Sequence, residues 1–146
     1  MPYKERSSIA IKFYRMERFF YLHKMKSVAQ VIYHMMQMVL GCTIPYSAEL
    51  DGGVNIAHFH GIVIHHKSSV GENTVIYQNV TLGGRNGESG PCVGKNCVIG
   101  AGACILGNIK IGDNVNIGAN AVVLEDIPDN CTAVGVPARI IKHNEE

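Results

Sequence analysis

The sequence of 146 residues contains no tryptophan, and only 17% of its residues are charged. An average globular protein has about 25% charged residues, and disordered chains combine high net charge with low hydrophobicity. Because 47% of the residues are hydrophobic, this chain has the apolar side chains that a buried core needs. The net charge of +1 argues against a dedicated nucleic-acid binder, since such proteins are far more basic. Length and composition predict one domain, or one domain with a short appendage.

Three further features are missing. The five cysteines form no CxxC pair, so neither a disulfide framework nor a structural zinc site is expected. No run of 18 apolar residues is present, which argues against a membrane-spanning helix. The N-terminus lacks the basic, apolar and small-residue order of a signal peptide. We therefore expect a cytoplasmic protein.

The first 42 residues predict a short α-helical segment. Residues 1–26 hold seven cations and two anions, whereas residues 27–40 hold no Lys, Arg, Asp or Glu. In the first stretch, apolar residues recur at the spacings of one helix face: Ile9, Phe13, Met16 and Phe20. Ser27 is a candidate cap for a second helix, which Gly41 ends. This second helix is apolar nearly all round, so we expect other structure to cover it.

Two interpretations of this segment remain open. It is either a helical cap packed on the body or on another subunit, or a basic, aromatic surface that touches the headgroups at the inner face of a membrane.

From residue 43 to residue 142 apolar residues recur every six positions, and only two insertions interrupt the count. The positions are Ile44, Leu50, Ile56, Ile64, Val70, Ile76, Leu82, Val93, Ile99, Ile105, Ile111, Ile117 and Val123. A period of six predicts a short strand and a turn, repeated three times per coil of a parallel β-helix with about four coils. The expected fold is an all-β body of hexapeptide repeats with an N-terminal α-helical segment, and residues 143–146 are expected to form a tail.

Four stretches of this body carry family motifs: HFHGIVI at 58–64, QNVTLGG at 78–84, VIGAGACILGNIKIG at 98–112 and AVGVPARII at 133–141. They resemble the hexapeptide-repeat acyltransferases, most closely the serine acetyltransferase branch and its sugar-modifying relatives. The resemblance implies a left-handed β-helix and a homotrimer, with acetyl-CoA as cosubstrate bound between neighbouring β-helices. It also implies that His58 is the catalytic base. An imidazole suits that role, because its pKa near 6.5 lets it take the proton of an attacking hydroxyl group.

Counting hexads places one residue of each coil along a single outer edge: His58, Gln78, Ala101 and Ala119. Small residues there leave room for the thin pantetheine arm of CoA. The candidate acceptor-binding residues are His60, Tyr77, Gln78, Asn79 and Arg85. The candidate CoA-binding residues are Gly83, Gly84, Ala101, Gly102, Ala119, Arg139 and Lys142. His60 falls where an inward residue is expected. The histidines occupy different places in the repeat, so we expect no metal site.

The sequence also departs from the serine acetyltransferase pattern. Aspartates stand fifteen positions and one position before the catalytic histidine in that family, and here these positions hold Thr43 and Ala57. The loop RNGESGPC keeps Arg85 but has no histidine, and we expect it to lie over the acyl or CoA site. Because a free amino acid needs partners for both of its charges, we expect a sugar hydroxyl of a surface polysaccharide or its precursor as the acceptor. The alternatives are serine itself and a non-enzymatic β-helix scaffold.

Overall fold

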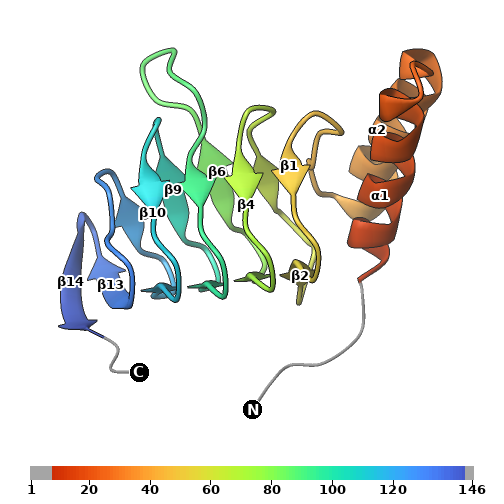
Figure 1. Cartoon of the computed structure of the whole chain (residues 1–146). Helices are drawn as coiled ribbons and strands as arrows, with labels where there is room; N and C mark the ends of the chain where they lie inside the picture. Colours follow the sequence, from red (N-terminus) through yellow and green to blue (C-terminus); the bar gives the residue numbers. More distant parts are fainter. Residues whose placement is uncertain (1–7, 144–146) are drawn as a thin grey trace.

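A helical hairpin precedes a three-sided β-helix in the computed structural model, which describes residues 8–143 (Figure 1). Helix α1 spans Ile9–Leu22, and α2 spans Lys26–Leu40. Helix α2 begins without a side-chain cap, so Ser27, which we expected to cap it, lies inside the helix. Gly41 ends α2 as predicted, with a φ of 64° that glycine adopts without steric cost.

Short strands then follow one another around the three faces of the β-helix. They are β1 Glu49–Leu50, β2 Asn55–Ile56, β3 Val63–Ile64, β4 Ser69–Val70, β5 Val75–Ile76, β6 Thr81–Gly83, β7 Cys92–Val93, β8 Val98–Ile99, β9 Cys104–Leu106, β10 Lys110–Ile111, β11 Asn116–Ile117, β12 Val122–Val123, β13 Cys131–Gly135 and β14 Ala138–His143. Face 1 contains β1-β4-β7-β10, face 2 contains β2-β5-β8-β11-β13, and face 3 contains β3-β6-β9-β12. All these pairings are parallel, and β14 closes face 2 by pairing antiparallel with β13.

The core is a set of stacked ladders inside the triangle. All thirteen hexad positions are buried, none with more than 4% of its surface exposed. Ile76 pairs with Ile56 on one side and with Ile99 on the other, so apolar side chains of successive coils lie directly above one another. The expected β-helix of hexapeptide repeats is confirmed, and both insertions fall at corners between strands.

Helix α1 covers the open edge of the first coil. The hydroxyl group of Tyr14 donates a hydrogen bond to the carbonyl oxygen of Ala48 and accepts one from the amide of Leu50. Arg15 donates to the carbonyl of Leu50 at 2.7 Å, and Arg18 donates to that of Tyr46 at 2.9 Å. An uncovered strand edge would leave such groups unpaired. Two of the basic residues of the segment therefore cap the body.

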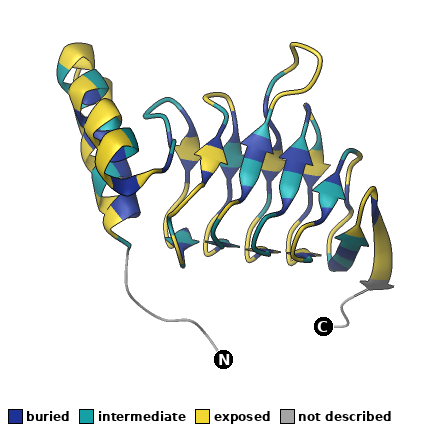
Figure 2. Cartoon of the chain, turned by 180° about the vertical axis from the view of Figure 1, so that it is seen from behind, coloured by how far each residue is buried: buried dark blue, intermediate teal, exposed yellow. Residues whose placement is uncertain are grey.

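The apolar stripe predicted on α1 is divided, because Phe13 packs against the core while two other members are exposed. Ile9 and Met16 are exposed, and the buried positions of this helix are Ala10, Ile11, Tyr14 and Glu17. Helix α2 is covered on one side only, where its buried residues are Ala29, Ile32, Met36 and Leu40. Figure 2 shows exposed stretches along both helices. Residues 8–143 thus cover α2 only in part, and a cover from another subunit stays a prediction. Neither helix in residues 8–143 has the length and hydropathy to cross a membrane.

Candidate active site

The corner between faces 2 and 3 carries the edge that we counted from the sequence. The amide of Gly102 donates to the carbonyl of Gln78 at 2.9 Å, and the amide of Asn120 donates to that of Ala101 at 2.8 Å. Gln78, Ala101 and Ala119 therefore occupy equivalent places in successive coils. We call this edge the His58 corner, because His58 lies on it in the first coil.

The first coil is wider at this corner because it contains the two-residue insertion. Counted from the strands, Ile56 pairs with Ile76, which puts His58 beside Gln78. The hydrogen bond of the turn gives a different equivalence. The amide of Asn79 donates to the carbonyl of His60, which puts His60 beside Gln78. The extra residues bulge outward, and His58 is exposed with its ring centroid 6.4 Å from that of Tyr77.

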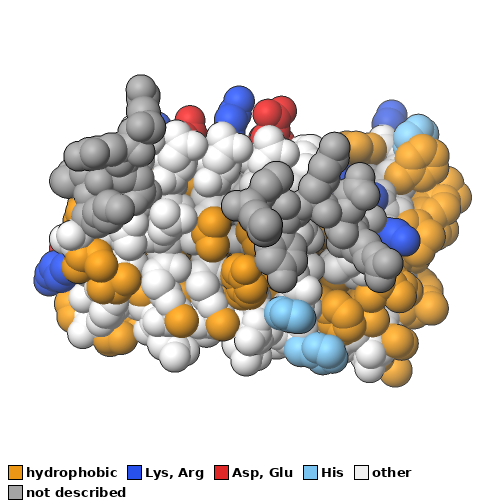
Figure 3. Space-filling model, turned by 90° about the horizontal axis from the view of Figure 1, so that it is seen from below, with side chains coloured by type: hydrophobic (Ala, Val, Ile, Leu, Met, Phe, Trp, Pro, Cys, Tyr) orange, Lys and Arg blue, Asp and Glu red, His pale blue; other side chains and the backbone are white. Residues whose placement is uncertain are grey.

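His60 does not point inward as we predicted. It is exposed and stacks on Phe59 with ring centroids 4.4 Å apart, while Ile62 fills the interior. The insertion is the reason: it moves the inward position from four residues after Ile56 to six. Figure 3, which views the molecule from below, shows histidine side chains beside the hydrophobic side chains of the helical end.

The other residues predicted near His58 divide into two kinds. Tyr77 and Gln78 are half-buried, and the Oε1 atom of Gln78 is buried without a hydrogen-bond partner in the described chain. Asn79 instead supports the corner, since it adopts a φ of 58° and its Oδ1 fills the space where a Cβ atom on Gly61 would lie. Gly102 also supports the corner, since it adopts a positive φ of 73°. Gln78 is thus the better-placed polar group for a substrate.

A second corner, between faces 3 and 1, carries Gly83, Gly84 and Arg85. The loop of residues 84–91 projects from it as the tallest loop in Figure 1. His58 precedes face 3 and Arg85 follows it, so one chain does not bring the two together. That the loop lies over the acyl or CoA site stays a prediction, which within one chain the His58 corner does not meet. We call this second edge the loop corner.

His65 forms the base of the loop corner. Its Nδ1 accepts a hydrogen bond from the amide of Lys67 at 3.2 Å. A Cβ atom on Gly90 would lie 3.0 Å from that nitrogen, and one on Gly84 would lie 3.4 Å from Nε2. Burial, followed by the nearby His66 and Lys67, lowers the pKa of His65. Both ends of the loop thus pack on an imidazole that favours the neutral form, a contact that the sequence did not indicate.

The two positions that hold aspartate in the resembled family lie beside the His58 corner without a carboxylate. Thr43 bridges to Val63 on face 3, and its Oγ1 accepts a hydrogen bond from Gln37 at 3.3 Å. Ala57 is half-buried. Among residues 8–143 no carboxylate forms a hydrogen bond with His58.

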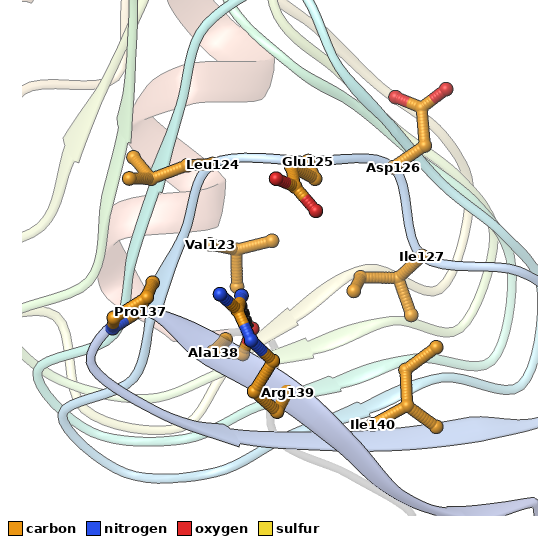
Figure 4. Close-up of a pocket in the computed structure, with 9 residues that line it drawn as sticks. All are labelled: Val123, Leu124, Glu125, Asp126, Ile127, Pro137, Ala138, Arg139 and Ile140. Carbon is orange, nitrogen blue, oxygen red and sulfur yellow. Dashed lines mark hydrogen bonds between the residues drawn. The ribbon is translucent and has the colours of Figure 1, made fainter.

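Arg139 lies at the far end of the β-helix from His58. It lines a cavity of about 340 Å³ between the last coil and β14, together with Glu125, Asp126 and apolar residues. Figure 4 shows the side chains of Arg139 and Glu125 on opposite walls of this cavity. Lys142 belongs to β14 and pairs with Thr132, but its side chain lies outside the described part. Within residues 8–143 no cluster of His, Cys, Asp and Glu is arranged to hold a metal ion.

Comparison with known proteins first identifies the repeat. Residues 93–125 match the family model described as bacterial transferase hexapeptide (six repeats). The matched stretch lies within the stacked ladders and carries the same six-residue repeat.

The similar proteins narrow the branch. The chain is 42% identical over 135 residues to a serine acetyltransferase of Synechococcus elongatus, a match that covers 90% of this chain and 55% of the relative. It is also 42% identical to a serine acetyltransferase of Staphylococcus epidermidis, with 92% and 61% covered. The chain thus spans little more than half the length of these relatives. The resemblance to hexapeptide-repeat acyltransferases of the serine acetyltransferase-like branch is confirmed.

Solved structures agree. Serine acetyltransferase from Vibrio cholerae superposes with a TM-score of 0.88 at 34% identity, over 94% of this chain and 54% of that one. The Brucella abortus enzyme in complex with coenzyme A gives 0.88 at 36% identity, over 93% and 56%. The Neisseria gonorrhoeae enzyme in complex with serine gives 0.85 at 39% identity, over 91% and 55%.

Proposed function

We propose that the protein is an acetyl-CoA-dependent O-acetyltransferase with His58 as its general base. The observation that carries the proposal is an exposed imidazole at the wide end of an edge that continues in Ala101 and Ala119. The imidazole takes the proton of the acceptor hydroxyl as its oxygen attacks the thioester carbonyl. The carbon–sulfur bond then breaks, and the CoA thiolate leaves and receives the proton. Such a base contributes about 10²–10⁴-fold to the rate.

Acetyl-CoA is supported as the cosubstrate by the coenzyme A complex of a structural neighbour. Along the His58 corner Ala101 and Ala119 present only methyl groups, so an extended pantetheine arm can reach the backbone. Arg139 offers a cation for a phosphate group at the other end of the edge. The role of Lys142 stays a prediction.

A homotrimer is part of this proposal. The candidate residues lie on two corners at opposite sides of face 3, and a threefold arrangement puts the loop corner of one subunit next to the His58 corner of its neighbour. Arg85 of one chain then lies in the same active site as His58 of another chain. Light scattering at micromolar concentration tests this, because a mass near that of one chain contradicts a shared site.

For the acceptor, the comparisons favour serine over our expected sugar. The similar proteins and structures described above are serine acetyltransferases, one of them in complex with serine. No comparison supports a polysaccharide as the main acceptor. We therefore propose the serine hydroxyl as the first acceptor to test, with Arg85 as the partner of its carboxylate.

A sugar hydroxyl remains the second candidate because of one specific observation. Thr43 and Ala57 provide no carboxylate for the ammonium group of serine, and leaving a charge without a partner in a site is costly. The half-buried Tyr77 and Gln78 provide an aromatic ring and an amide beside His58, which suit a neutral sugar.

The test is release of free CoA from acetyl-CoA with serine, simple sugars or oligosaccharides as acceptor. His58→Ala should lower turnover by about 10²–10⁴-fold and leave the fold intact, because the side chain is exposed. His34→Ala on α2 is the matched control and should keep full activity. Turnover of His58→Ala within a few-fold of the parent would remove His58 as the base.

A further inference from the structure

The two helices present apolar side chains on the side away from the β-helix. Besides Tyr21, the exposed apolar residues on α1 are Ile9, Met16, Phe19 and Leu22, and on α2 they are Val31, Met35, Met38 and Val39. Leu22 is 63% exposed, Met38 86% and Val39 71%. On α2 the four follow the spacing i, i+4, i+7, i+8, which is one continuous face opposite the buried one. We call these eight residues the outer surface of the hairpin.

Charge on the hairpin has a single sign. Residues 8–40 contain five Lys and Arg residues and one acid, Glu17, and Glu17 is fully buried. Arg15 and Arg18 bind carbonyl groups of the first coil. The remaining cations, Lys12, Lys24 and Lys26, are exposed, and the only ion pair found in residues 8–143 joins Lys95 to Glu72. Within residues 8–40 the apolar surface is therefore accompanied by exposed cations and by no exposed acid (Figure 3).

The apolar side chains and the cations together decide which of two partners fits the outer surface, a second copy of this chain or a lipid membrane. A twofold contact of this surface with a second copy would bring the same cations of both copies together, which is unfavourable. An anionic lipid surface satisfies both features at once, because its acyl chains accept the apolar side chains and its headgroups attract lysine. We propose that the outer surface of the helical hairpin binds anionic lipid membranes peripherally.

The probe is sedimentation of the full chain with vesicles of phosphatidylcholine alone or of phosphatidylcholine mixed with phosphatidylglycerol. We expect binding to the anionic vesicles that weakens as salt rises, since exposed charges are screened. The double variant Met38→Ser with Val39→Ser should lower the partition coefficient more than tenfold. The triple variant of Lys12, Lys24 and Lys26 to Gln should lower it by about 100-fold, because each cation near an anionic surface contributes about fivefold.

The matched control is Val136→Ser with Ile141→Ser, two exposed apolar residues at the opposite end of the β-helix. It should bind vesicles as the parent does. Circular dichroism checks that each variant is folded, and the lysine variant carries the test if the apolar one unfolds, since its side chains are exposed.

Three outcomes overturn the proposal: no preference for anionic vesicles, equal binding of the parent and both variant sets, or equal loss in the control. A concentration-dependent rise in mass that only the Met38 and Val39 variant abolishes would assign the surface to a second copy instead. Since no arm measures acetyl transfer, the result is independent of the proposed function.

Discussion

The hydroxyl group of Tyr14 on α1 donates a buried hydrogen bond of 2.6 Å to the carbonyl oxygen of Ala48 in the first coil. The same hydroxyl accepts a bond of 3.1 Å from the amide of Leu50. One side chain thus replaces the strand that would otherwise precede β1, and it joins the helical hairpin to the β-helix.

Tyr14→Phe should therefore destabilise the protein although it removes a single oxygen atom. Arg18 still donates to the Ala48 carbonyl, but the buried Leu50 amide loses its partner, which costs about 1–3 kcal/mol. In a chain of this size that lowers Tm by about 2–4 °C per kcal/mol, as thermal unfolding can measure. Tyr21→Phe, at an exposed position of the same helix, should leave Tm unchanged; equal shifts in both variants would contradict the bridging role.

Glu17 on α1 should make the stability of the folded chain depend on pH. Its carboxyl group is fully buried, and neither oxygen has a hydrogen-bond partner in residues 8–143. Burial raises the pKa of Glu17 from 4.5 to about 8. A negative charge at Glu17 would in turn raise the pKa of Tyr33 on α2 and of Cys42, although burial is the larger cause for both.

Because the pKa of Glu17 is higher in the folded than in the unfolded chain, the free energy of unfolding should fall as pH rises from about 4.5 to about 8. The slope is about 1.4 kcal/mol per pH unit in that range. Glu17→Gln should remove this slope, and denaturant unfolding at several pH values measures it. The slope is independent of any loss of stability that the amide itself causes. A parent whose stability stays level between pH 5 and pH 8 would show that Glu17 is ionised and paired in the folded chain.

The interior ladders could be predicted from the sequence, because the apolar residue of each six-residue repeat is also the buried one. Thirteen positions such as Ile76 and Ile99 had to lie inside, since any shift by one residue would expose every apolar side chain. Local departures from the period could not be predicted in the same way. The insertion after Ile56 exchanged the expected places of His60 and Ile62.

The side of α1 that faces the β-helix could not be predicted from the apolar pattern either. Ile9 and Met16 of its predicted apolar stripe lie outside, and the buried positions include Tyr14 and Glu17. Hydrogen bonds to the open coil edge, rather than apolar content, decided which side of α1 faces the body. The candidate site divides similarly, because the count of six found the His58 edge but not that Arg85 belongs to another corner.

Ala119→Tyr tests the edge itself. The backbone bonds stack Ala119 above Ala101 on the His58 corner, and its exposed side chain is not part of the interior ladder. A tyrosine ring there should block the pantetheine arm, so CoA affinity measured by calorimetry should fall more than tenfold with little change in Tm. Lys95→Tyr, at another exposed corner, is the control. Unchanged affinity of Ala119→Tyr would mean that CoA does not follow this edge.

Gly90→Ala tests how the loop corner holds Arg85. A Cβ atom on Gly90 would overlap the Oγ atom of the buried Ser68 and lie 2.8 Å from the Cβ atom of His65. The Ser68 hydroxyl can rotate, but the His65 Cβ atom is fixed to the backbone of the coil below and cannot yield. The C-terminal end of the loop must therefore move, and we expect the shift to change the position of Arg85 at its other end.

If Arg85 binds the acceptor carboxylate, the KM for serine should rise by about 10–100-fold, the equivalent of a lost charge-assisted hydrogen bond, while CoA affinity is kept. Gly52→Ala is the control, since a Cβ atom there meets nothing within 4 Å. Steady-state CoA release over a range of serine concentrations gives kcat and KM separately. An unchanged KM for serine in Gly90→Ala, together with normal folding, would remove the loop corner from the acceptor site and leave the half-buried groups beside His58 as its only candidates in the described chain.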